Sequence, residues 1–167
     1  MSSLTFETGN DLPGRAREQV VDLLNRRLAA AIDLAAQAKQ AHWNVKGAQF
    51  IALHKLFDDV HGAAQEFADL LAERVVQLGG VADGILQSVA QQSDLTGYPR
   101  AIADGLEHVN ALAGALAEFG ARMRRTIDET DDLGDSVSAD MCTEITRGID
   151  KLLWFVEAHA QTAGATV

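Results

Sequence analysis

Residues 49–80, QFIALHKLFDDVHGAAQEFADLLAERVVQLGG, decide the fold. Apolar side chains recur there mostly three or four residues apart, which is the period of a helix with one buried face. These positions are Leu53, Phe57, Val60, Phe67, Leu71, Val75 and Leu78. Gly79 and Gly80 then end the pattern, and glycine is common just after the last turn of a helix. The stretch therefore predicts an amphipathic helix of about thirty residues.

Three further stretches show the same period, and strand-like alternation is hard to find. They cover residues 15–44, 100–130 and 136–159, with Pro13 and Pro99 expected to set the start of the first two. The connections at Lys46-Gly47 and around Gly134 are short, whereas residues 79–99 form a long connection with a short helix expected at 85–92. Short, long, short is the connectivity of a ferritin-like four-helix bundle with one crossover, so we predict this all-α fold.

The composition fits one bundle of this size. The chain has 167 residues, 47% of them hydrophobic, and a formal charge of −10. We expect a domain at 15–160, an N-terminal tail at 1–14 that contains no Lys or Arg, and a short C-terminal tail at 161–167. The single cysteine, Cys142, excludes an intrachain disulfide and any multi-cysteine metal site. No long apolar run and no secretory signal are found, so we expect a cytoplasmic protein without a membrane segment.

Five potential metal ligands stand out: His42, His54, Asp58, Asp69 and Glu73. The last four form two pairs spaced i,i+4, and such pairs share a helix face. Asp58 and Asp69 lie eleven residues apart, about 16 Å along a helix, which is too far for one ion. Two antiparallel copies of this helix, related by a two-fold axis, would bring the first pair of one chain opposite the second pair of the other. The spacing thus predicts a dimer with two equivalent sites.

The alternative is that these are ordinary polar positions on amphipathic helices. His61, three residues after Asp58, could be mistaken for a ligand, and we interpret His108 and His159 as surface residues. The sequence contains no Glu-x-x-His, so a di-iron centre within one chain is disfavoured. Two imidazoles with three carboxylates suit a first-row metal such as iron better than calcium or magnesium.

Three segments resemble the Dps family, the mini-ferritins. They are KQAHWNVKGAQFIALHKLFDD (39–59), AERVVQLGGVADG (72–84) and DKLLWFVEAH (150–159). The likeness extends from about Leu12 to His159, and all five positions of the family's ferroxidase pattern are filled. The resemblance implies a hollow shell of twelve subunits with a ferroxidase site at each two-fold interface. One subunit would supply His42, His54 and Asp58, and its neighbour Asp69 and Glu73. It also implies Fe(II) oxidation, preferably by hydrogen peroxide, and storage of the Fe(III) mineral.

The resemblance extends to residues around the site. Trp43 occupies a family position, where it would either stack near the metal or pack in the interface. Asp135, Asp140 and Glu144 match the carboxylates of an iron-entry pore at a three-fold axis, although acids at a helix start are also favoured by the helix dipole alone. Lys55 stands where many members carry an acid, which leaves Asp59 or Glu66 as candidates for mineral nucleation.

The sequence argues against DNA binding. Family members that bind DNA use tails rich in Lys and Arg, but residues 1–14 have none and none follows Lys151. The cluster of Arg122, Arg124 and Arg125 is interpreted as a solvated helix face. An acidic shell repels phosphate backbones, so we predict weak or absent DNA binding. Two other hypotheses stay open: a nucleoid-compacting protein with a secondary iron site, which the tails disfavour, and a shell that binds zinc or another divalent metal without efficient oxidation.

Overall fold

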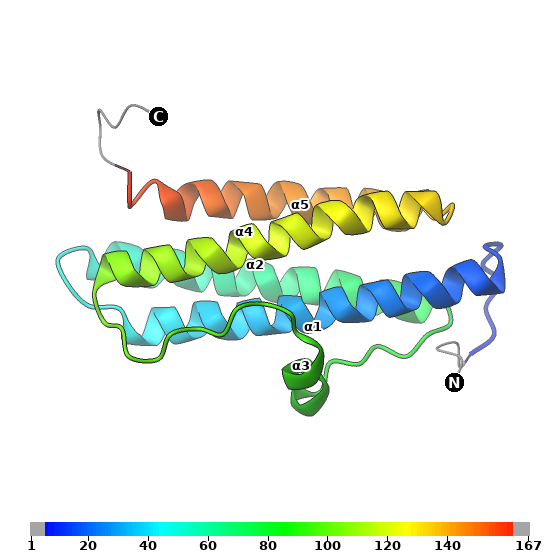
Figure 1. Cartoon of the computed structure of the whole chain (residues 1–167), viewed down its shortest axis with the longest axis horizontal. Coiled ribbons are helices and arrows are strands. Elements are labelled where there is room, and N and C mark those ends of the chain that lie inside the picture. Colours follow the sequence, from blue (N-terminus) through cyan, green and yellow to red (C-terminus); the bar gives the residue numbers. More distant parts are fainter. Residues whose placement is uncertain (1–5, 162–167) are drawn as a thin grey trace.

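A computed structural model describes residues 6–161 of the chain. Four long helices form an antiparallel bundle, and a short fifth helix lies in the connection between the second and third of them (Figure 1). Their bounds are α1 Gly14–Asn44, α2 Phe50–Gln77, α3 Leu86–Gln92, α4 Gly105–Asp132 and α5 Ser136–Glu157. The predicted all-α bundle with a long crossover is confirmed. Within the described part of the chain, no helix is long and apolar enough to cross a membrane.

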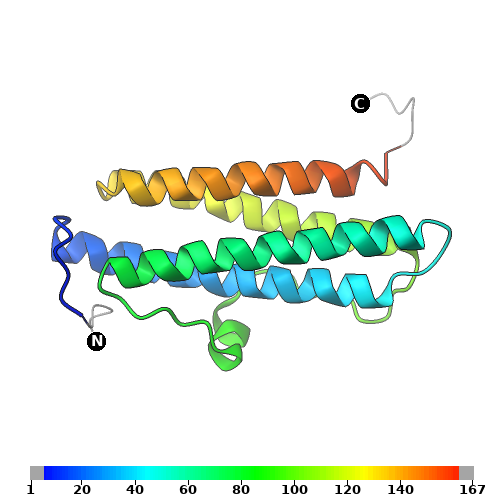
Figure 2. The same cartoon turned by 180° about the vertical axis from the view of Figure 1, so that it is seen from behind.

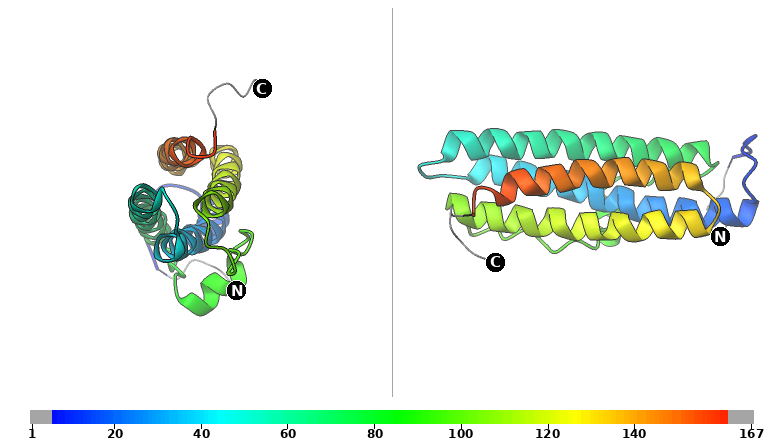
Figure 3. Two further views of the ribbon diagram at one scale, coloured as in Figure 1. Left: turned by 90° about the vertical axis from the view of Figure 1, so that its left-hand side faces the viewer. Right: turned by 90° about the horizontal axis from the view of Figure 1, so that it is seen from above.

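The bundle consists of two helical hairpins, α1–α2 and α4–α5. Seen from behind, the crossover leaves the end of α2 and runs along the bundle to the start of α4 (Figure 2). Seen end-on, the four long helices surround a common centre and α3 lies outside them (Figure 3). The apolar stripes meet in that centre, where Leu24, Phe57, Leu112 and Phe119 are fully buried. Burial of these stripes is the main stabilising contribution to such a fold.

The long helices α2 and α5 approach closely at one glycine. A Cβ atom on Gly148 would lie 2.6 Å from the Phe67 ring, so α5 has room for this aromatic ring only because residue 148 lacks a side chain. Gly79 and Gly134 end α2 and α4 with positive φ angles of 87° and 82°, as expected for glycine just past a helix C-terminus.

The predicted start of α4 near residue 100 is wrong. Residues 100–104 continue the crossover, and α4 begins at Gly105, where the Asp104 side chain accepts a hydrogen bond from the backbone N–H of Leu106. Lys46 also donates its backbone N–H to the carbonyl of Ala103, at 2.9 Å. This contact between the first hairpin turn and the crossover delays the helix, and no local sequence pattern reports it.

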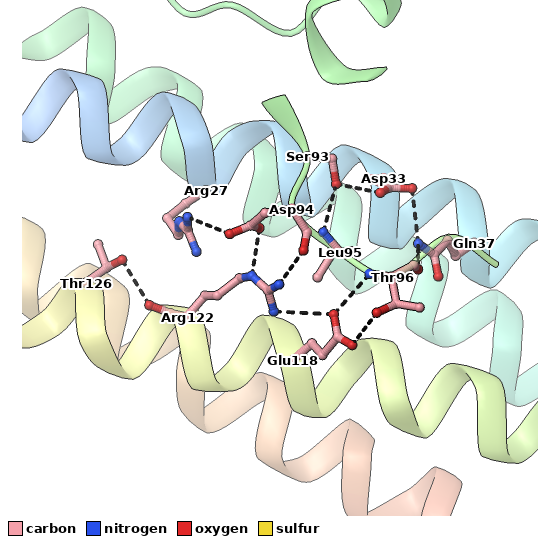
Figure 4. Close-up of polar contacts among 10 residues, drawn as sticks. All are labelled: Arg27, Asp33, Gln37, Ser93, Asp94, Leu95, Thr96, Glu118, Arg122 and Thr126. Carbon is pink, nitrogen blue, oxygen red and sulfur yellow. Dashed lines mark hydrogen bonds and ion pairs between the residues drawn. The ribbon is translucent and has the colours of Figure 1, made fainter. Parts of the chain in front are cut away.

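The crossover is fixed to α1 and α4 by a polar network (Figure 4). The Asp94 carboxylate pairs with Arg27 of α1 at 3.4 Å and with Arg122 of α4 at 2.7 Å. Glu118 accepts hydrogen bonds from the backbone N–H and the hydroxyl of Thr96, at 3.0 and 2.7 Å. Arg122 is thus partly buried and ion-paired, which corrects its interpretation as part of a solvated cluster.

Part of the predicted N-terminal tail is docked on the bundle. The backbone N–H of Phe6 donates to the carbonyl of Gly79 at 3.1 Å, and the Thr8 hydroxyl donates to the carbonyl of Gln77 at 3.3 Å. These contacts attach the residues before α1 to the end of α2. Residues 1–5 and 162–167 of the two predicted tails lie outside the described residues.

The prediction that His108 is a surface residue is wrong. Its side chain is buried, with 1% of the residue exposed, and Nδ1 lies 2.6 Å from the hydroxyl of Tyr98. Burial lowers the pKa of His108 and raises the pKa of Tyr98. His159 is partly buried near the start of α4. Position 108 lies on the apolar stripe of α4, so the helix period favours burial and the crossover supplies the polar partner.

Candidate metal centre

His42 and His54 face each other across the first hairpin turn. His42 lies in the last turn of α1 and His54 in the second turn of α2, and the short connection between these helices brings them together. The two rings stack with centroids 3.6 Å apart and an interplanar angle of 22°. A single chain thus brings both histidines to one place.

Each of these imidazoles is oriented by the backbone of the other residue. Nδ1 of His42 lies 2.7 Å from the carbonyl oxygen of His54, and Nδ1 of His54 lies 2.8 Å from the carbonyl oxygen of His42. A carbonyl oxygen only accepts hydrogen bonds, so each Nδ1 carries the proton and donates it. In the neutral form of each ring, Nε2 then keeps an unshared electron pair. This is the arrangement found in metal-ligating histidines, whose second nitrogen is held by a carbonyl or a carboxylate.

Asp58 lies one turn after His54 and is held by a cation. The Lys39 ammonium forms a very short ion pair with Asp58 Oδ1, and Nδ1 of His42 lies 3.9 Å from the same oxygen. The hydrogen bond from Lys39 is the main cause that lowers the pKa of Asp58. The carboxylate, about half exposed, is therefore ionised and already accommodates a positive charge. Lys39 was missed by the sequence reasoning, although its i,i+3 spacing to His42 places both on one face of α1.

Asp69 and Glu73 are not brought to the histidines within one chain. Both are accessible on the later half of α2, and Asp69 lines a groove of about 540 Å³ between α1, α2 and the crossover. Among residues 6–161, no three His, Cys, Asp or Glu side chains come close enough to hold a metal ion. One chain thus presents two histidines and Asp58 at one end of α2, and two carboxylates further along the same helix.

Trp43 follows His42 in the sequence and is 66% exposed, so residues 6–161 leave most of its large apolar ring uncovered. Such a ring on a surface is typical of a contact with another molecule. Lys55, Asp59 and Glu66 are also exposed on α2. Their positions do not discriminate between the candidates for mineral nucleation.

The three predicted pore carboxylates do not share one environment. Asp140 and Glu144 are exposed one turn apart on α5. Asp135 is only 2% exposed. It caps α5 by accepting the backbone N–H of Ser138 at 3.0 Å, and it pairs with the buried Arg74 at 2.8 Å. Both of its oxygens are engaged inside the chain, which favours a structural role for Asp135. Its place in a pore lining stays a prediction.

Comparison with known proteins shows the family to which this fold belongs. The ferritin-like domain family model matches residues 21–164. The DNA protection during starvation protein of Agrobacterium fabrum is 46% identical over 157 residues, which cover 94% of this chain and 97% of that protein. The chain belongs to the Dps family. DpsA14 from Streptomyces coelicolor has a TM-score of 0.92 at 31% identity, and the superposition covers 99% of this Dps chain and 98% of the DpsA14 chain. Dps from Mycobacterium smegmatis has a TM-score of 0.92 at 29% identity, with coverage of 98% and 99%.

Membership of the Dps family supports a mini-ferritin role in iron storage. In this Dps chain the histidine pair at the first hairpin turn is the part of the candidate centre that a single subunit already orders. The remaining donors, Asp69 and Glu73, are presented outward.

Proposed function

We propose that the chain is the subunit of a ferroxidase and iron store whose metal centres form between two copies. The reciprocal orientation of His42 and His54 carries this proposal, because it leaves two imidazole nitrogens available to a cation. They lie beside the Asp58 carboxylate, which already holds the Lys39 ammonium that a metal ion would replace. Antiparallel pairing of two α2 helices would bring Asp69 and Glu73 of the second copy to these three residues. The two-fold axis would then cross α2 between residues 63 and 64, midway between both opposed pairs.

The donor set suits the oxidation of Fe(II). Three carboxylates favour the higher charge of Fe(III), and two neutral imidazoles complete the ligand set without further negative charge. With hydrogen peroxide as the preferred oxidant, two Fe(II) ions give one electron each, the O–O bond breaks, and two protons are taken up to form two water molecules. The Fe(III) products then hydrolyse to the stored oxide-hydroxide and release protons. Trp43 would lie beside this chemistry, either as a ring stacked near the site or as packing in the interface.

Iron entry and assembly complete the proposal. The Dps family assembly is a dodecamer, and three copies of Asp140 and Glu144 around a three-fold axis would concentrate negative charge that attracts Fe(II). We propose a bundle domain at 15–160, a cytoplasmic location and weak or absent DNA binding. Docking of residues 6–13, which lack Lys and Arg, supports the last point, since it leaves no basic arm there to reach a phosphate backbone.

Anaerobic loading with Fe(II), followed by hydrogen peroxide, tests the proposal. We expect fast growth of ferric absorbance, with iron that elutes at the size of the assembled shell. A His54→Ala/Asp58→Ala variant should oxidise iron slowly. The matched control, His159→Ala/Asp128→Ala, removes the same residue types outside the proposed ligand set and should behave like the wild type. Equal rates in all three proteins, or iron that precipitates outside the shell, would instead favour a shell that binds zinc or another divalent metal without oxidation.

A further inference from the structure

We propose that His61 is a sixth ligand of the shared centre and binds the second of the two Fe(II) ions that each turnover consumes. This inference rests on the proposed function and deepens it. His61 lies on α2 three residues after Asp58 and is partly exposed.

The orientation of His61 matches that of the two proposed histidine ligands. Its Nδ1 lies 2.8 Å from the carbonyl oxygen of Ala35 on α1. The carbonyl accepts only, so Nδ1 carries the proton and Nε2 keeps its electron pair. Three of the five histidines, His42, His54 and His61, share this arrangement. His42 and His54 are proposed metal ligands, whereas no contact in the described part of the chain uses the Nε2 of His61.

His61 is also on the correct face of α2. Together with Asp69 it lines the groove of about 540 Å³ between α1, α2 and the crossover, so a cation can reach it. Asp58 is flanked by His54 one turn before it and by His61 one turn after it, because side chains at i,i+3 and i,i+4 are neighbours on a helix.

The chemistry needs such a donor. Peroxide accepts two electrons and each Fe(II) gives one, so two ions must be held close together. Five residues supply few donor atoms for two ions, so the carboxylates would have to bind both ions at once. A further imidazole raises the affinity for a first-row divalent metal without adding negative charge. At the proposed interface His61 is the remaining histidine whose Nε2 is free.

The hydrogen bond to Ala35 could instead be the whole role of His61, as an anchor between α2 and α1. The variant His61→Gln separates the two roles. Its amide N–H can still donate to the Ala35 carbonyl, but it offers no imidazole nitrogen to a metal. His61→Leu removes both functions. Circular dichroism and sizing chromatography of each assembled variant show whether the fold and the assembly are retained.

The measurement is an anaerobic titration with Co(II), a redox-stable probe whose visible absorption reports the ligands around it. We expect the wild type to bind two Co(II) ions per subunit. His61→Gln should bind the first ion as the wild type does and the second at least about tenfold more weakly. The control His159→Gln should match the wild type.

Two Co(II) ions with unchanged affinity in His61→Gln would overturn the inference, as would a wild type that binds one ion per subunit. The proposed function has a separate readout in the same titration. If His54→Ala/Asp58→Ala binds Co(II) as the wild type does, the shared centre itself is wrong. If that double variant loses binding while His61→Gln does not, the role of His61 alone is refuted.

Discussion

The substitution Asp135→Ala distinguishes a structural carboxylate from one that lines an iron-entry pore. In the folded chain both oxygens of Asp135 are occupied: Oδ1 accepts from Arg74 and from the backbone N–H of Ser138, and Oδ2 accepts from the Ser138 hydroxyl. Alanine removes all three contacts at once. It leaves the Arg74 guanidinium, 8% exposed, without its counter-ion, and it leaves the first turn of α5 without a cap.

The expected loss of stability follows from these contacts. Removing one partner of a buried ion pair costs about 3–5 kcal/mol. Loss of an N-cap side chain costs about 1 kcal/mol. One carboxylate serves both roles, so the two costs overlap and we expect about 4 kcal/mol in the free energy of unfolding. For a domain of this size that corresponds to a melting temperature lower by about 8–16 °C.

Thermal unfolding followed by circular dichroism measures this loss. Protein concentration must be fixed, because assembly makes the transition concentration-dependent. Asp135→Asn keeps a capping oxygen and removes the charge, so it isolates the ion pair. Asp140→Ala, on the exposed face of the same helix, should change stability by no more than about 0.5 kcal/mol. The reasoning is refuted if Asp135→Ala melts like Asp140→Ala, and slower iron uptake at unchanged stability would support the pore assignment.

Three further predictions use contacts described above. Lys39→Met removes the cation that competes for Asp58, so Co(II) should bind about two- to fivefold more tightly in the same titration, the range set by an exposed ion pair; weaker binding would show that Lys39 helps to hold the metal. Gly148→Ala forces a Cβ against Phe67 and should destabilise the fold by about 1–3 kcal/mol, with Phe67→Leu in the same chain recovering part of the loss in a thermal melt. Burial raises the pKa of Cys142 from 9.0 to about 12, so above pH 9 the unfolded chain releases a proton that the folded chain retains. The stabilisation is complete below pH 9 and is lost as the pH rises to about 12. Urea melts across this range should show a larger loss in the wild type than in Cys142→Ala, which keeps the contribution of the buried Tyr98.

The helices could be predicted from sequence because apolar period and chain punctuation are local. Residues 49–80 carry both signals, and α2 begins and ends within a residue or two of its predicted bounds. The start of α4 was predicted too early, although Asp104, the residue that caps it, stands directly before the helix in the sequence. The contact between Lys46 and the crossover, more than fifty residues apart, has no such local signal. Pro99 lies within the crossover, between the end of α3 at Gln92 and the start of α4 at Gly105.

The candidate site was predictable to the extent that it lies on one helix. The i,i+4 spacings place Asp58 with His54 and Asp69 with Glu73 without any tertiary information. What sequence could not show is the set of partners that each polar side chain finds elsewhere in the fold. Asp135 matched a pore pattern, but its partner Arg74 lies 61 residues away. Arg122 looked solvated until the crossover placed Asp94 beside it.

The division of donors along α2 has a consequence for the newly made chain. A single subunit orders His42, His54 and Asp58, but its described residues supply no further donors there to enclose a metal ion. The Asp58 carboxylate is paired with the Lys39 ammonium instead. If the centre is shared between two copies, a single chain therefore lacks the ligands that complete it. Under the proposed function, peroxide would oxidise Fe(II) at this centre only after two chains have paired, so subunit pairing would determine when the oxidation can begin.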